Sequence, residues 1–134
     1  MKITEAAFAR EGVLGPSGLA GCKFLVIDDS RMIRLTISKH LRQIGFESID
    51  EADNGAAAID LLRTGKDYDL VLLDLLLPGK SGLEWLAELR RDELHRELPV
   101  IVISGHASSE ESAQAIKLGA ADFFEKPLNR ERIL

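Results

Sequence analysis

The chain has little of what several classes of protein require. Its 134 residues include one cysteine, Cys22, which excludes an internal disulfide or a multi-cysteine zinc site and favours a reducing compartment. No apolar run approaches the roughly 20 residues of a membrane-spanning helix, and the N-terminus lacks the apolar segment of a signal peptide. We therefore predict a cytoplasmic location and no membrane partner.

The chain also lacks an excess of positive charge. Seventeen Lys and Arg residues stand against 22 Asp and Glu residues, so the formal net charge is −5. This balance disfavours capture of the nucleic-acid backbone, and we predict no direct nucleic-acid binding. The length suits one domain and excludes a two-domain enzyme.

Glycine and proline are concentrated in one early stretch. Gly12, Gly15, Gly18 and Gly21 surround Pro16, and such a composition is typical of a linker. We therefore divide the chain into a flexible extension or linker over residues 1–22 and one folded domain over residues 23–134.

Short apolar runs alternate with amphipathic segments in the remaining sequence. Apolar runs predict strands over residues 23–28, 46–52, 69–74, 99–104 and 122–125. A stripe of isoleucine and leucine ending at Gly45 predicts the first helix, and Asn54, Ser81, Ser108 and Asn129 are predicted to cap later ones. Ser81 with Glu84, and Ser108 with Glu111, have capping-box spacing. The alternation predicts an α/β domain with a doubly wound, five-stranded parallel sheet and helices on both faces.

Polar and ionisable residues follow four of the predicted strands. They are Asp28 and Asp29, Asp74, Ser104, and Lys126 with Pro127. The carboxyl ends of parallel strands meet at one edge of a sheet, where open α/β proteins bind their ligands. We therefore expect one composite site at this edge.

The charges of these residues indicate what the site binds. Three carboxylates held about 4 Å apart repel by roughly 4 kcal/mol per pair at an effective dielectric constant of 20, so the cluster needs a cation or raised pKa values. Mg²⁺ prefers oxygen ligands and combines one or two carboxylates with phosphate oxygens. Lys126 and Ser104 suit phosphate oxygens, and Asp74, on a central strand, is the expected nucleophile for an aspartyl phosphate.

These motifs resemble the receiver domains of two-component response regulators. The resemblance runs from Lys23 to the C-terminus. It rests on the Asp28–Asp29 pair, on Asp74 in LVLLDLLLPG, on Ser104 in PVIVISGHA, and on Lys126 and Pro127 in FFEKP. It implies a flavodoxin-like sheet with strand order 2-1-3-4-5.

The resemblance also implies a role for each site residue. Asp74 is expected to accept a phosphoryl group, and Asp28, Asp29, Asp74 and the backbone carbonyl of Leu76 to bind Mg²⁺ or Mn²⁺. Ser104 and the aromatic Phe123 are expected to switch on phosphorylation. A cis peptide bond is expected before Pro127.

Partners follow from the same resemblance. The phosphodonor is expected to be a sensor histidine kinase or a histidine phosphotransfer protein. A homodimer through the fourth helix, fifth strand and last helix is a further expectation. The last helix stops at Leu134 after about one and a half turns, so we expect a truncated chain or one that continues into a C-terminal effector domain.

Two alternatives use the same residues. A Mg²⁺-dependent phosphohydrolase with an aspartyl nucleophile needs the same acids, hydroxyl and lysine, although the order of motifs argues against it. A receiver that only docks, without phosphorylation, is the second alternative, and the complete acidic set argues against it.

Overall fold

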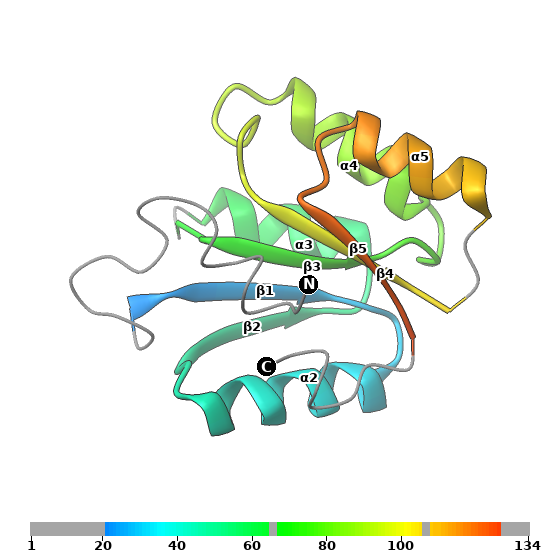
Figure 1. The fold of residues 1–134 in the computed structure, drawn as a ribbon. Coiled ribbons are helices and arrows are strands. Elements are labelled where there is room, and N and C mark those ends of the chain that lie inside the picture. The colour runs from blue at the N-terminus through cyan, green and yellow to red at the C-terminus, as the bar shows by residue number, and fades with distance from the viewer. Residues whose placement is uncertain (1–20, 65–66, 106–107, 127–134) are drawn as a thin grey trace.

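The computed structural model describes residues 21–64, 67–105 and 108–126 (Figure 1). The strands are β1 (Lys23–Ile27), β2 (Ser48–Ala52), β3 (Leu70–Asp74), β4 (Val100–Ser104) and β5 (Asp122–Glu125). The helices are α2 (Arg31–Ile44), α3 (Gly55–Arg63), α4 (Gly82–Arg91) and α5 (Ser109–Lys117). The strands form one parallel sheet in the order β2-β1-β3-β4-β5, as predicted.

Helices cover the sheet on both faces. Figure 1 shows α2 on one face and α3, α4 and α5 on the other. Every residue of β3 and β4 is buried, which explains why their sequences are apolar almost throughout rather than alternating. Two buried clusters result, one around Phe24, Ile37 and Leu41 beneath α2, and one around Leu73, Trp85 and Leu86 beneath the other helices.

Side-chain caps determine where the described helices begin. The side chains of Ser30, Asn54, Ser81 and Ser108 each accept a hydrogen bond from a backbone N–H in the first turn. Ser108 and Glu111 form the complete predicted capping box. The capping box at Ser81 is incomplete. The Glu84 carboxylate accepts a hydrogen bond from Ser81 Oγ at 3.4 Å, whereas a complete box needs one from the Ser81 backbone N–H.

Several residues lie differently from the sequence prediction. Strand β2 begins at Ser48 rather than at residue 46, and the Phe46 ring instead packs edge-on against Phe24 with centroids 4.7 Å apart. Cys22 was assigned to the end of the extension, yet it is fully buried in the cluster beneath α2. For Trp85 the sequence pattern favours neither the core edge nor a partner surface; the structure buries it fully, and its indole N–H donates to the Gly55 carbonyl at 3.2 Å.

Other predictions lie outside the described residues. These are the flexible extension as far as residue 20, the peptide bond before Pro127, and the last helix from Asn129. Within the described ranges, no helix combines the length and the apolar character needed to cross a membrane.

The turn between β3 and α4 holds Gly82 against the strand end. The Gly82 N–H donates to the Leu75 carbonyl at 2.9 Å, and a Cβ at this position would lie 2.5 Å from the Asp74 carbonyl oxygen. Nothing but glycine fits here without moving the backbone that carries Asp74.

We predict that Gly82→Ala lowers the free energy of unfolding by about 2 kcal/mol, because overpacking of this kind displaces backbone. Chemical denaturation followed by circular dichroism measures the change. Gly105→Ala is the matched control, since a Cβ there meets nothing within 4 Å. Equal stability of the two variants would contradict the prediction.

Candidate functional site

The carboxyl ends of four strands bring the predicted polar residues together. Asp28 follows β1, Asp74 ends β3, Ser104 ends β4 and Lys126 follows β5. Asp28, Asp74 and Ser104 are 0%, 2% and 1% exposed. Burial of polar groups is costly without compensation, so these three residues mark a built site rather than a solvated edge.

Three carboxylates of this site are close enough to share one cation. Asp28, Asp29 and Asp74 each offer an oxygen, and these oxygens lie within 4.8 Å of one another. Asp29 is exposed while the other two are buried. A set of hard oxygen donors, open to solvent on one side, fits Mg²⁺ or Mn²⁺, which retain several water ligands.

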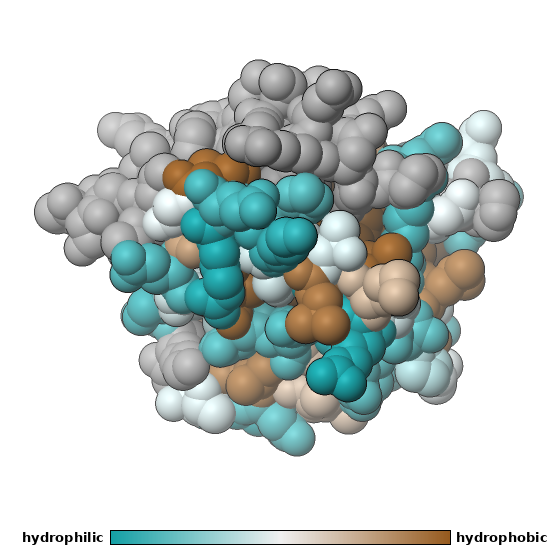
Figure 2. Space-filling model, turned by 90° about the horizontal axis from the view of Figure 1, so that it is seen from below, coloured by the Kyte–Doolittle hydropathy of each residue, from teal (hydrophilic) through white to brown (hydrophobic). Residues whose placement is uncertain are grey.

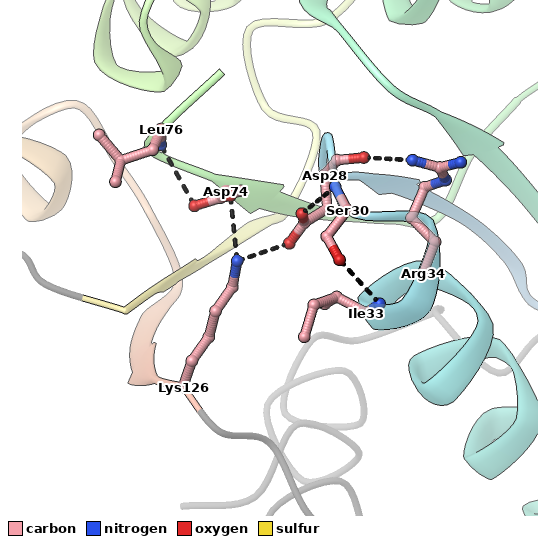
Figure 3. A network of polar contacts seen from close by, with 7 residues as sticks. All are labelled: Asp28, Ser30, Ile33, Arg34, Asp74, Leu76 and Lys126. Atoms are coloured by element: carbon pink, nitrogen blue, oxygen red, sulfur yellow. Dashed lines mark hydrogen bonds and ion pairs between the residues drawn. The ribbon is translucent and has the colours of Figure 1, made fainter. Parts of the chain in front are cut away.

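Lys126 lies between two of these carboxylates (Figure 3). Its Nζ is 2.8 Å from Asp28 Oδ2 and 3.0 Å from Asp74 Oδ2. Burial alone would lower the pKa of Lys126, but the two carboxylates outweigh burial and raise it. The ammonium group therefore stays charged and partly neutralises the cluster.

The Asp74 carboxyl responds mainly to its burial. Burial raises its pKa above the ordinary value of 3.8, and the charge of Asp28 adds to the increase. Hydrogen bonds from Lys126 and from the Leu76 N–H, which donates to Asp74 Oδ1 at 3.2 Å, oppose it. The ionised carboxylate is thus less favourable here than in water.

The remaining predicted residues surround this centre to different degrees. Ser104 Oγ is buried and, among the described residues, has no hydrogen-bond partner. Phe123 is half-buried against the cluster beneath α3, α4 and α5. Leu76 directs its N–H to Asp74, and the metal-binding role of its carbonyl stays a prediction.

Sequence reasoning missed two residues that support the site. Gly82 allows the close approach to Asp74 described above. Arg34 donates from Nη1 to the Asp28 carbonyl at 2.7 Å, and its Nε pairs with Glu51 at 3.1 Å. Arg34 lies on a predicted helix within two turns of the Asp28–Asp29 pair, and this position could have indicated its role. Its partner Glu51 belongs to a different element, β2, so the sequence alone did not predict their contact.

The fold and the site define the class of protein. A parallel sheet of order 2-1-3-4-5, with carboxylates at the ends of neighbouring central strands, is the flavodoxin-like, doubly wound arrangement. The chain matches the response regulator receiver domain family over residues 24–134, and it belongs to this family.

Individual relatives agree with this membership. The chain is 35% identical over 105 residues to the chemotaxis protein CheY-3 of Vibrio cholerae. This alignment covers 78% of this chain and 80% of that protein. The receiver domain of NtrX from Brucella abortus superposes with a TM-score of 0.74 at 36% identity, covering 83% of this chain and 91% of that chain.

A third relative has a known phosphorylated form. A response regulator from Burkholderia pseudomallei, with a phosphorylated aspartic acid, a calcium ion and citrate in its structure, superposes with a TM-score of 0.73 at 32% identity. The alignment covers 84% of this chain and 64% of that one.

We predict that Asp74→Asn raises the melting temperature of the metal-free protein by a few degrees at pH 7. A raised pKa means that the ionised Asp74 destabilises the folded state, so a neutral amide removes a cost. The difference should shrink as the pH falls toward the ordinary carboxyl range, because wild-type Asp74 then also becomes neutral. Calorimetry in chelator measures both effects.

The control for this experiment is Asp60→Asn, an exposed position on α3. A lower melting temperature for Asp74→Asn than for wild type at pH 7 would contradict the prediction.

Proposed function

We propose that this receiver domain accepts a phosphoryl group on Asp74 from a phosphohistidine of a sensor histidine kinase or a histidine phosphotransfer protein. The observation that carries the proposal is the buried Asp74 carboxylate, 3.0 Å from the Lys126 ammonium and beside two further carboxylates. The phosphorylated aspartic acid of the Burkholderia pseudomallei relative supports it.

The transfer exchanges one bond to phosphorus for another. An Asp74 carboxylate oxygen attacks phosphorus, the bond between phosphorus and the donor's imidazole nitrogen breaks, and that nitrogen keeps the electron pair. Lys126 stabilises the negative charge on the phosphoryl oxygens, and Asp74 changes from a free carboxylate to an acyl phosphate. Water then attacks the phosphorus atom, the bond between phosphorus and the Asp74 oxygen breaks, and inorganic phosphate leaves while Asp74 returns to a carboxylate. This self-dephosphorylation is the only turnover expected.

Asp28, Asp29, Asp74 and the Leu76 carbonyl would hold Mg²⁺ or Mn²⁺ in this proposal. The bound cation supplies positive charge that offsets repulsion between the carboxylates and the incoming phosphoryl group. Burial of Asp28 and Asp74 keeps water from screening these charges.

Phosphorylation would switch the surface beyond the site. The added charge and acceptor oxygens attract the hydroxyl of Ser104 on β4, which has no hydrogen-bond partner in the part of the chain that the structure describes. Phe123 on β5, half-buried and without a hydroxyl of its own, would follow by repacking. The face of α5 and β5, together with the last helix predicted from Asn129 onward, which lies outside the described residues, is thus the proposed output surface.

Partners of this surface complete the proposal. This surface can pair two copies of the chain or contact a C-terminal effector domain beyond residue 134. The proposed location is cytoplasmic, as predicted from the sequence. The domain itself is proposed to bind neither nucleic acid nor membrane.

We predict that incubation with Mg²⁺ and acetyl phosphate adds one phosphoryl group per chain, and that Asp74→Asn abolishes the addition. Intact-mass spectrometry measures it. Asp69→Asn is the control, because Asp69 precedes the same strand at its other end and accepts a hydrogen bond from the Lys23 N–H. Continued phosphorylation of Asp74→Asn would overturn the assignment, and rapid multiple turnover of phosphate esters would favour a phosphohydrolase.

We predict that Ser104→Ala slows phosphorylation by acetyl phosphate about tenfold, because a hydrogen bond to a charged group contributes about 1.5–3 kcal/mol. Its melting temperature should change little, since the hydroxyl has no partner among the described residues. Ser38→Ala is the matched control, as Ser38 Oγ is likewise buried and unpartnered in the described ranges but lies on α2. An equal effect of the two substitutions on the rate would contradict a role for Ser104.

A further inference from the structure

Arg34 on α2 connects the acidic centre to the edge strand of the sheet. Its Nη1 donates to the Asp28 backbone carbonyl at 2.7 Å, and its Nε pairs with Glu51 Oε1 on β2 at 3.1 Å. Figure 3 shows the guanidinium on the side of Asp28 away from Lys126. The Arg34 side chain is only 14% exposed, so it is a packed group rather than a solvated charge.

The other polar atoms of Asp28 already have partners. Its N–H donates to the Ala52 carbonyl at 3.1 Å, and its Oδ1 accepts from the Ser30 N–H at 2.8 Å. Its Oδ2 forms an ion pair with Lys126 Nζ at 2.8 Å, although among the described residues no hydrogen bond is made to this oxygen. The donor from Arg34 to the carbonyl adds a hydrogen bond on the backbone side of Asp28.

The Asp28 carbonyl belongs to the peptide unit that joins Asp28 to Asp29. Because this unit is planar, holding the carbonyl oxygen also fixes where the Asp29 backbone begins. The Asp29 carboxylate is exposed, and within the described ranges no hydrogen bond to it is formed. Its place within 4.8 Å of the other two carboxylates therefore depends on the backbone.

We propose that Arg34 is a positioning residue for the divalent-cation site. It holds the Asp28–Asp29 peptide so that both carboxylates face the same point as Asp74, and Glu51 in turn holds the guanidinium. The inference rests on the proposed function, in which these carboxylates bind Mg²⁺ or Mn²⁺. Groups that orient metal ligands in this way commonly change metal affinity ten- to a hundredfold when mutated.

Charge and geometry predict opposite results for Arg34. A guanidinium close to the site repels a divalent cation, so if only its charge mattered, its removal would strengthen cation binding. If Arg34 positions the ligands, its removal weakens binding despite the loss of that repulsion. The sign of the change therefore separates the two roles.

The experiment measures Mn²⁺ affinity of the full chain by electron paramagnetic resonance. We expect Arg34→Met to weaken binding about tenfold. Arg34→Lys keeps the charge but loses the planar fork that reaches two acceptors, so it should also weaken binding. Arg42→Met is the matched control, because Arg42 lies on the same helix and donates to the Glu47 carbonyl at 2.9 Å.

Each result decides for or against the proposal. Unchanged or tighter binding by Arg34→Met, wild-type affinity of Arg34→Lys, or an equal loss in Arg42→Met would overturn it. If circular dichroism shows Arg34→Met to be unfolded, Glu51→Gln decides, with a loss of Mn²⁺ affinity expected because one of the two anchors of Arg34 weakens. No loss would overturn the proposal. Failure of wild type to bind Mn²⁺ would instead overturn the cation site of the proposed function, and the role of Arg34 with it.

Discussion

The mutual repulsion of three carboxylates is the constraint on which the rest of this structure depends. Asp28, Asp29 and Asp74 place oxygens within 4.8 Å of one another, and two of these residues are buried. In water such charges would separate, whereas here the ends of neighbouring parallel strands keep them together. Lys126, reaching in from the end of β5, offsets part of the repulsion and thereby ties the strand at one edge of the sheet to β1 and β3.

The backbone around the carboxylates is held as firmly as the side chains. Gly82 leaves room for α4 to start directly against the Asp74 carbonyl, and Ser30 both caps α2 and donates its N–H to Asp28. On the outer side of α2, where hydrophilic side chains gather with a few hydrophobic ones among them (Figure 2), Arg34 turns inward. Unfavourable charge is thus stabilised by hydrogen bonds from several elements rather than by one partner.

The local pattern of apolar and capping residues predicted most helices and strands, but it misplaced particular residues. The continuous apolar runs predicted β3 and β4, because a strand buried on both faces has no polar face to alternate with. Phe46 was assigned to a strand because it is apolar, but its burial comes from ring packing on Phe24 in the turn before β2. The spacing of Ser81 and Glu84 predicted a capping box, yet the Glu84 carboxylate accepts a hydrogen bond from the Ser81 hydroxyl instead.

The sequence by itself determined the order of strands and helices, the parallel sheet and the residues at the strand ends, because these follow from periodicity, caps and chain connectivity. Only the tertiary structure decided that Asp74 is buried beside Lys126, that Ser104 lacks a partner among the described residues, and that Arg34 meets both Asp28 and Glu51. Such contacts join residues of different strands and helices. Their distances depend on how the whole sheet packs, and no local pattern in the chain records them.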